Sequence, residues 1–169
     1  MGVDNAISVA RLVSELGGVT GRKRLQKLVH LLQASGARDF PQRFTLHYFG
    51  PFSRELVHDL EVAVSSELAK EAQPAFEEDG YAYSVSESAR QRIDQLLGTK
   101  PSWRARAHRL NAETTPFLEA ASTLVFLAQR GTLPDQLKDR FRKLKPHLVY
   151  LFARARDFAK REGLLAENS

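Results

Sequence analysis

Histidine and aspartate side chains are the first residues to test for chemistry. His58 and Asp59 are adjacent, with His30 upstream and Asp94 downstream. This order is typical of HD-type metal-dependent phosphohydrolases, in which His and Asp on neighbouring helices hold a divalent cation. Two-residue pairs are common by chance, and the chain lacks the HExxH, P-loop, GxSxG and strand-linked GxGxxG signatures. We keep this metal hydrolase as a remote alternative and predict no enzyme, no metal site and no cofactor.

Basic side chains offer a second kind of chemistry, the neutralisation of phosphate. Four of them cluster at the start of a predicted helix over 21–34: Arg22, Lys23, Arg24 and Lys27. Polar residues predicted on the same exposed side are Gln26, His30 and Gln33. Such side chains contact phosphates and base edges, and a helix N-terminus adds its own attraction for phosphate. The four basic residues are the first candidate nucleic-acid contacts.

A second basic run includes an aromatic ring. It consists of Trp103, Arg104, Arg106, His108 and Arg109. An aromatic and basic segment can follow a nucleic-acid strand, or its long side chains can lie over the C-terminal helices with their charges in water. We name Arg104, Arg106 and Arg109 as the second set of candidate contacts.

The charge is unevenly divided along the 169 residues. Residues 1–99 carry 11 Lys and Arg against 13 Asp and Glu, whereas residues 100–169 carry 14 against 7. Positive potential attracts polyanions, so this bias favours a nucleic-acid partner, and a solvated basic surface explains it equally well. There is no cysteine, hence no disulfide and no thiolate metal site. Because we find no signal-peptide pattern and no long apolar run in the sequence, we expect a cytoplasmic protein with no membrane segment.

Hydrophobic periodicity and turn residues predict a mainly α fold with a small β component. The expected N-terminal elements are helices over 4–16, 21–34 and 54–66, a strand over 44–49, a hairpin of 70–76 with 81–86, and a helix to about 97. Three helices followed by a hairpin are typical of a winged helix. We expect the strand over 44–49 to pair with that hairpin, whose first strand contains Pro74 and whose tip is Glu77, Glu78, Asp79 and Gly80.

Cap and turn residues sharpen these expectations. Thr20, Ser53 and Ser86 are predicted N-caps. In the GPFS turn over 50–53, Gly permits the bend, Pro restricts φ and Ser caps the next helix. We expect one packed cluster around this turn: Leu25, Leu28, Tyr48, Phe49, Phe52 and Leu56.

The rest of the chain is helical in pattern. Helices are predicted near 103–110, 116–130, 134–144 and 146–162, and the segment 116–130 is apolar almost all round, so we expect it to be buried. The predicted organisation is a winged-helix-like domain over 1–98 and a basic helical domain over 99–169. An apolar helix can also serve as a dimer interface, so a homodimer remains an alternative.

Two segments carry a resemblance to a known family, residues 21–32 (GRKRLQKLVHLL) and 46–56 (LHYFGPFSREL). The chain resembles the uncharacterised YwgA-like proteins, in which a KLQKL helix precedes a YGPYS-x-EL turn and helix. Phe49 and Phe52 stand where that pattern has tyrosine. Residues 121–127 and 144–146 are similar too, so the resemblance covers most of the chain, and the pattern is more distantly reminiscent of Panacea antitoxin domains. The resemblance implies a winged helix with a helical C-terminal part.

The charges near the expected recognition helix oppose DNA. Its predicted exposed residues are Arg54, Glu55, Asp59 and Glu61, and the hairpin tip is acidic. Acidic groups there repel the phosphate backbone. We therefore predict a non-enzymatic DNA-associated regulator or accessory factor that contacts phosphates through its basic clusters. The alternative is a protein-interaction module that uses the acidic third helix and wing.

Overall fold

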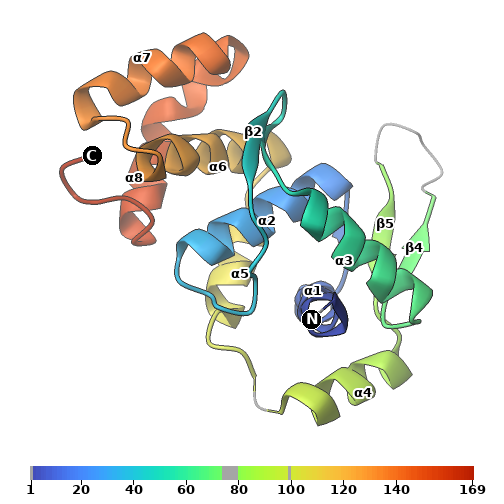
Figure 1. Cartoon of the computed structure of the whole chain (residues 1–169). Coiled ribbons are helices and arrows are strands. Elements are labelled where there is room, and N and C mark those ends of the chain that lie inside the picture. The colour runs from blue at the N-terminus through green and yellow to red at the C-terminus, as the bar shows by residue number, and fades with distance from the viewer. Residues whose placement is uncertain (1, 74–79, 99) are drawn as a thin grey trace.

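The computed structural model describes residues 2–73, 80–98 and 100–169 (Figure 1). Its N-terminal part contains α1 (Gly2–Glu15), β1 (Val19–Thr20), α2 (Arg22–Ala34), β2 (Thr45–His47), β3 (Gly50–Phe52), α3 (Arg54–Ser65), β4 (Lys70–Ala72), β5 (Ala82–Ser84) and α4 (Glu87–Leu97). The chain continues through α5 (Arg104–Asn111), α6 (Thr115–Gln129), α7 (Pro134–Leu144), a 3₁₀ helix (Pro146–Leu151) and α8 (Phe152–Arg161). The prediction of a mainly helical chain with a small β component is confirmed.

One of the two sheets joins the start of the chain to the predicted hairpin. β4 and β5 are antiparallel, as expected, and β1 pairs antiparallel with the other edge of β5, with Val19 opposite Tyr83. Because Thr20 lies in β1, its prediction as an N-cap is wrong. The cap position of α2 is Gly21, whose φ of 99° favours glycine and whose N–H donates to the Tyr81 carbonyl. The predicted hairpin tip and Pro74 fall within 74–80, of which 74–79 lie outside the described residues.

The other sheet is a separate hairpin that corrects the prediction of a single strand over 44–49. β2 pairs with β3, with Leu46 opposite Pro51 and His47 opposite Gly50. The predicted strand therefore pairs with the segment that directly follows it and not with the β4–β5 hairpin. The turn residues Tyr48 and Phe49 point outward and are 80% and 54% exposed. Their predicted packing with the neighbouring leucines is therefore wrong.

The GPFS turn is held by a buried amide. Ser53 caps α3 by accepting a hydrogen bond from the Leu56 N–H, and Ser86 caps α4 through the Ala89 N–H, so both cap predictions are confirmed. Gln26 donates to the Ser53 carbonyl at 2.9 Å and accepts from the Ser53 N–H at 2.8 Å. Gln26 is buried, contrary to its predicted exposure, because it completes the hydrogen bonds of this turn.

The hydrophobic core runs across the predicted boundary at residue 98. Helix α6 is buried along almost its whole length, as predicted, and contacts α2. Trp103 packs against Phe40 with ring centroids 5.3 Å apart, and its indole N–H donates to Asp39. Residues 1–98 and 99–169 thus share one core, whereas their division into two domains stays a prediction.

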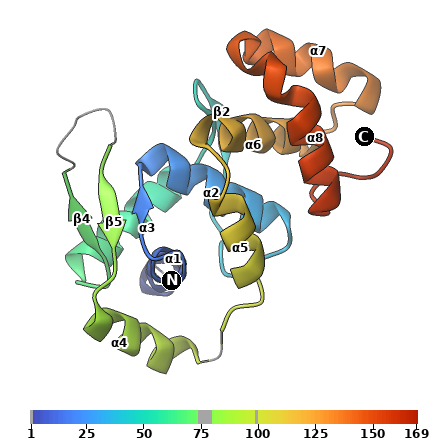
Figure 2. The ribbon, with the colours of Figure 1, turned by 180° about the vertical axis from the view of Figure 1, so that it is seen from behind.

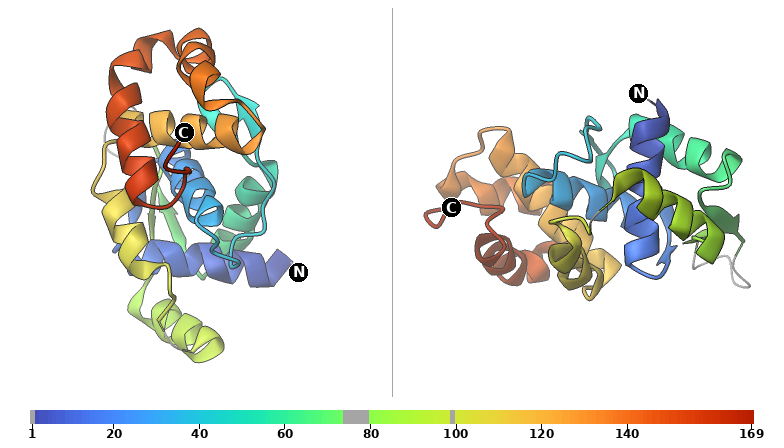
Figure 3. Two further views of the ribbon diagram at one scale, coloured as in Figure 1. Left: turned by 90° about the vertical axis from the view of Figure 1, so that its left-hand side faces the viewer. Right: turned by 90° about the horizontal axis from the view of Figure 1, so that it is seen from below.

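Helices α2 and α6 form the middle of the molecule (Figure 1). The β4–β5 hairpin and α4 lie at one end, and α7 and α8 lie at the other. Figure 2 shows α5 beside α2, and in Figure 3 α6 crosses close to α2. Within the described residues, no helix combines the length and apolar character needed to cross a membrane.

Candidate nucleic-acid interface

The first candidate contacts, Arg22 and Lys23, lie at the start of α2 and are half-exposed. The Arg22 guanidinium donates to the Tyr83 hydroxyl at 2.8 Å and forms an ion pair with Glu71 at 3.1 Å. The hydrogen bond to Tyr83 raises the pKa of Arg22. Lys23 forms an ion pair with Glu119 at 2.8 Å and lies 4.4 Å from the centre of the Phe49 ring. Both cations already have partners in this chain.

Arg24 connects α2 to the segment between α5 and α6. Its guanidinium donates to the Asn111 side chain and carbonyl, to the Glu113 carbonyl and to the Thr115 hydroxyl. The fork of N–H groups on a guanidinium suits several acceptors at fixed angles. These four hydrogen bonds hold α2 against the start of α6. Arg24 therefore has a structural role.

Replacing Arg24 by alanine is expected to lower the free energy of unfolding by about 2 kcal/mol, since several acceptors lose a charged donor and water replaces it only partly. The measurement is urea unfolding followed by circular dichroism. Arg38→Ala serves as the control because Arg38 is exposed, and a change within about 0.5 kcal/mol is expected there. Equal effects of the two substitutions would rule out the connecting role of Arg24.

Lys27, the fourth candidate, is buried, so the prediction that it is exposed is wrong. It is 2% exposed, and its Nζ donates to the Pro51 carbonyl at 2.6 Å. Burial, together with the neighbouring cations Lys145 and Lys23, lowers the pKa of Lys27 to about 7 against the opposing effect of Glu119. Lys27 therefore holds the GPFS turn from inside.

A buried carboxylate completes this network. Glu119 of α6 forms an ion pair of 2.8 Å with each of Lys23 and Lys145, and Lys145 also donates to the Tyr48 carbonyl. Burial raises the pKa of Glu119, but the hydrogen bonds from Lys145 and Lys23 outweigh it, so the pKa lies below its usual value. Lysines from two distant segments thus anchor the β2–β3 turn. We call Lys23, Lys27, Lys145 and Glu119 the lysine network.

The second set of candidates is also paired within the chain. Arg104 of α5 bonds Glu15 of α1, while Arg106 and Arg109 both bond Glu162, at 3.2 and 2.7 Å. The hydrogen bonds from Arg109 and then Arg106 lower the pKa of Glu162. These arginines tie α5 to the end of α1 and to the residue that follows α8.

The histidines and aspartates of the HD pattern are not gathered at one place. His30 is buried, contrary to its predicted exposure, and its Nδ1 is 2.7 Å from the Ser122 hydroxyl. Burial, with a smaller contribution from the nearby Lys27, lowers the pKa of His30 to about 3. His58 is exposed on α3. The part of the chain that the structure describes holds no group of three or more His, Cys, Asp or Glu side chains suited to a metal ion.

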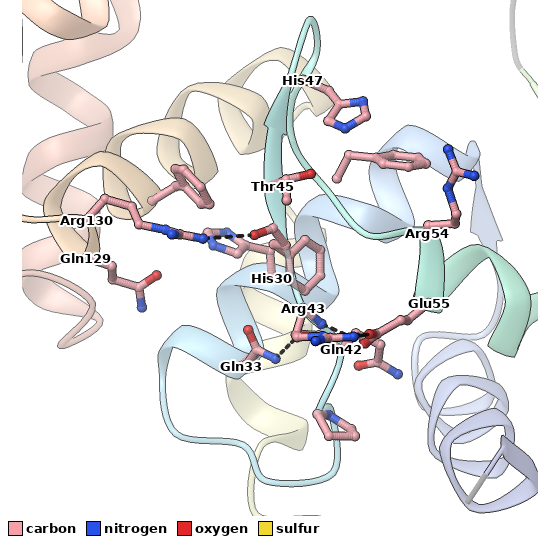
Figure 4. Close-up of a pocket in the computed structure, with 14 residues that line it drawn as sticks. His30, Gln33, Gln42, Arg43, Thr45, His47, Arg54, Glu55, Gln129 and Arg130 are labelled. Carbon is pink, nitrogen blue, oxygen red and sulfur yellow. Dashed lines mark hydrogen bonds and ion pairs between the residues drawn. The ribbon is translucent and has the colours of Figure 1, made fainter.

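A pocket with a volume of about 780 Å³ lies between α2, the β2–β3 hairpin, the start of α3 and the end of α6 (Figure 4). Its lining residues are His30, Gln33, Pro41, Gln42, Arg43, Phe44, Thr45, His47, Phe52, Arg54, Glu55, Phe126, Gln129 and Arg130. The buried rings of His30, Phe44 and Phe126 form part of the wall. The centroid of the His30 ring lies 5.0 Å from that of Phe44 and 6.0 Å from that of Phe126. We call this cavity the arginine pocket.

The charges of the arginine pocket do not cancel. Glu55 is occupied by Arg43, whose backbone N–H and guanidinium donate to its two oxygens at 2.9 and 2.8 Å. The backbone hydrogen bond and then the side-chain hydrogen bond from Arg43 lower the pKa of Glu55. Arg54 and Arg130 remain, and Arg130 lies 5.0 Å from the centre of the Phe126 ring. The pocket therefore has an excess of positive charge.

Sequence reasoning missed the arginine pocket because its residues come from four separated segments. Arg43 and Arg130 stand alone among neutral neighbours, and no spacing links them. The one available signal was Arg54, which follows the GPFS turn at the first position of α3. The candidate basic residues that are clustered in sequence instead have carboxylate, carbonyl or other polar partners within the fold.

These features define a mainly helical protein with two small sheets, a lysine network and an arginine pocket. It is similar to the uncharacterised protein YwgA of Bacillus subtilis (strain 168), with 26% identity over 141 residues that cover 80% of this chain and 77% of YwgA. No family model matches the chain. The similarity supports a YwgA-like relationship over most of the chain and assigns no function, because YwgA is itself uncharacterised.

Proposed function

We propose that the chain is a non-enzymatic, DNA-associated binding protein built on a winged helix. A winged helix has three helices and a terminal hairpin, with a short strand after the first helix that pairs with the hairpin. Here α1, β1, α2, α3, β4 and β5 follow in that order, and the sheet order β1-β5-β4 brings β1 beside the hairpin. The β2–β3 hairpin is an insertion between the second and third helices.

The observation that carries the DNA proposal is the positive arginine pocket at the start of α3, the helix that in a winged helix usually enters the major groove. Two of the acidic residues whose charge is expected to repel DNA have partners within the fold. Glu55 is neutralised by Arg43, and Asp59 is buried and accepts a hydrogen bond from Gln42 at 2.8 Å. Arg54 and His58 are exposed on the same helix. These positions favour approach of phosphate to α3.

The basic candidates divide by their exposure. We assign phosphate contact first to Arg54 and Arg130 of the arginine pocket, and second to the half-exposed Arg22 and Lys23. Arg24 and Lys27 stabilise the fold. Arg104, Arg106 and Arg109 supply positive potential, although carboxylates neutralise much of it at short range.

The test is binding of labelled duplex and single-stranded DNA by fluorescence anisotropy across a salt series. We expect affinity to fall with salt, and Arg54→Ala/Arg130→Ala to reduce the slope of log K against log salt by about 2, because two phosphate contacts are lost. Arg92→Ala/Lys143→Ala is the matched control, since it removes two exposed charges from α4 and α7. Absence of binding at low salt, or equal slopes for the two double variants, would refute the proposal.

A protein partner is the second candidate function, and the exposed β2–β3 turn favours it. Tyr48 and Phe49 contact each other edge to face at 4.8 Å, and the lysine network holds their backbone. Rigid exposed aromatic rings are frequent anchors of protein interfaces. The acidic surface that the sequence predicts for this role is reduced, because Glu55 and Asp59 have partners within the chain.

A further inference from the structure

The arginine pocket offers cationic groups on two sides. In Figure 4, Arg130 approaches from the C-terminal end of α6 and Arg54 from α3, with Thr45 between them. Arg130 donates to the Phe44 carbonyl at 3.3 Å, which leaves most of its N–H groups available. No hydrogen bond or ion pair of Arg54 is found within the described residues. A guanidinium donates two parallel N–H groups to two phosphate oxygens, so each of these arginines suits a phosphate group.

Aromatic rings and amides lie beside these cations. The rings of His47 and Phe52 are 4.7 Å apart, with 34° between their planes, and both line the pocket together with Arg54. A planar base stacks on such rings whatever its identity. Gln33 donates to the carbonyls of Phe40 and Gln42, which fixes its orientation and leaves its own oxygen as an acceptor, and Gln129 is exposed on the other side. Amide side chains at fixed positions bind base edges.

We propose that the arginine pocket binds one nucleotide unit, its base stacked against His47 and Phe52 and its phosphate held by Arg54, while Arg130 adds positive charge from the opposite side of the pocket. The inference deepens the proposed DNA association by naming the ligand chemistry of this pocket. A volume of about 780 Å³ lies within the roughly 300–1,000 Å³ of ligand pockets. The nucleotide comes from one of two sources, a free nucleoside phosphate or an unpaired position of a DNA strand.

The experiment is isothermal titration calorimetry of the full chain with adenosine 5′-monophosphate, adenosine, inorganic phosphate and a short single-stranded oligonucleotide. We expect the monophosphate to bind at least about tenfold more tightly than either adenosine or phosphate, because stacking and ion pairing act together. Arg54→Ala is expected to weaken the monophosphate about tenfold and to leave adenosine almost unchanged. His47→Ala is expected to weaken both, since it removes the stacking surface.

Arg92→Ala is the matched control, and thermal melts establish that each variant is folded. Binding of the monophosphate without any binding of DNA supports the pocket and a free nucleotide, and refutes the proposed function. Oligonucleotide binding that Arg54→Ala weakens but His47→Ala leaves unchanged overturns the pocket inference, because no base is then stacked, and leaves DNA association standing. Equal affinity for monophosphate and inorganic phosphate also overturns the inference, because the base then contributes nothing.

Discussion

Replacing Glu119 by glutamine is expected to lower the free energy of unfolding by about 3–5 kcal/mol, the cost of leaving a buried charge without its partner. The glutamine keeps the shape and one acceptor, but it removes the negative charge that lies 2.8 Å from both Lys23 and Lys145. The side chains of Lys145 and Glu119 are 2% and 4% exposed, so water cannot replace the lost interaction. Urea unfolding at neutral pH measures the change.

Glu113→Gln is the matched control because it removes the same charge from an ion pair of similar length. Glu113 lies 2.7 Å from Arg154, whose side chain is 57% exposed, so a loss below about 1 kcal/mol is expected. If the two substitutions destabilised the protein equally, the lysine network would not depend on the charge of Glu119.

The sequence predicts elements well where local pattern decides them. The apolar run of α6, the serine caps of α3 and α4, and the β4–β5 hairpin all follow from residues close together in the chain. A continuous apolar helix has to be buried on every side, and a serine before a helix satisfies that helix's first N–H groups. These predictions need no knowledge of distant contacts.

The polar face of α2 shows why other residues could not be placed. Periodicity assigns its leucines to the core and leaves Gln26, Lys27 and His30 on the opposite side. That side is covered in the fold by the GPFS turn and by α6, which supply the Ser53 backbone, the Pro51 carbonyl and the Ser122 hydroxyl as partners. Buried polar residues look exposed in a sequence because their partners lie far along the chain.

The buried amine of Lys27 predicts an unusual dependence of stability on pH. Its pKa is about 7 in the folded protein against 10.5 ordinarily, because burial disfavours the charged form. At pH below about 7 the amine is protonated in both states, and the cost of burying the charge is fully present. Between about 7 and 10.5 the unfolded chain binds more protons than the folded one, so stability rises with pH. The expected rise is on the order of 4 kcal/mol.

The variant Lys27→Met isolates this effect. Methionine fills similar space without an ionisable group, so the difference in unfolding free energy between the natural protein and the variant is expected to grow in favour of the natural protein as pH increases from about 7 toward 10.5. Urea unfolding at each pH measures that difference, from which the titration of all other groups cancels to first order. The neutral amine still donates to the Pro51 carbonyl, so the natural protein gains stability without losing this contact. A difference that stays constant across the range would mean that Lys27 keeps its ordinary pKa, and hence that Glu119 compensates its charge as well as those of Lys23 and Lys145.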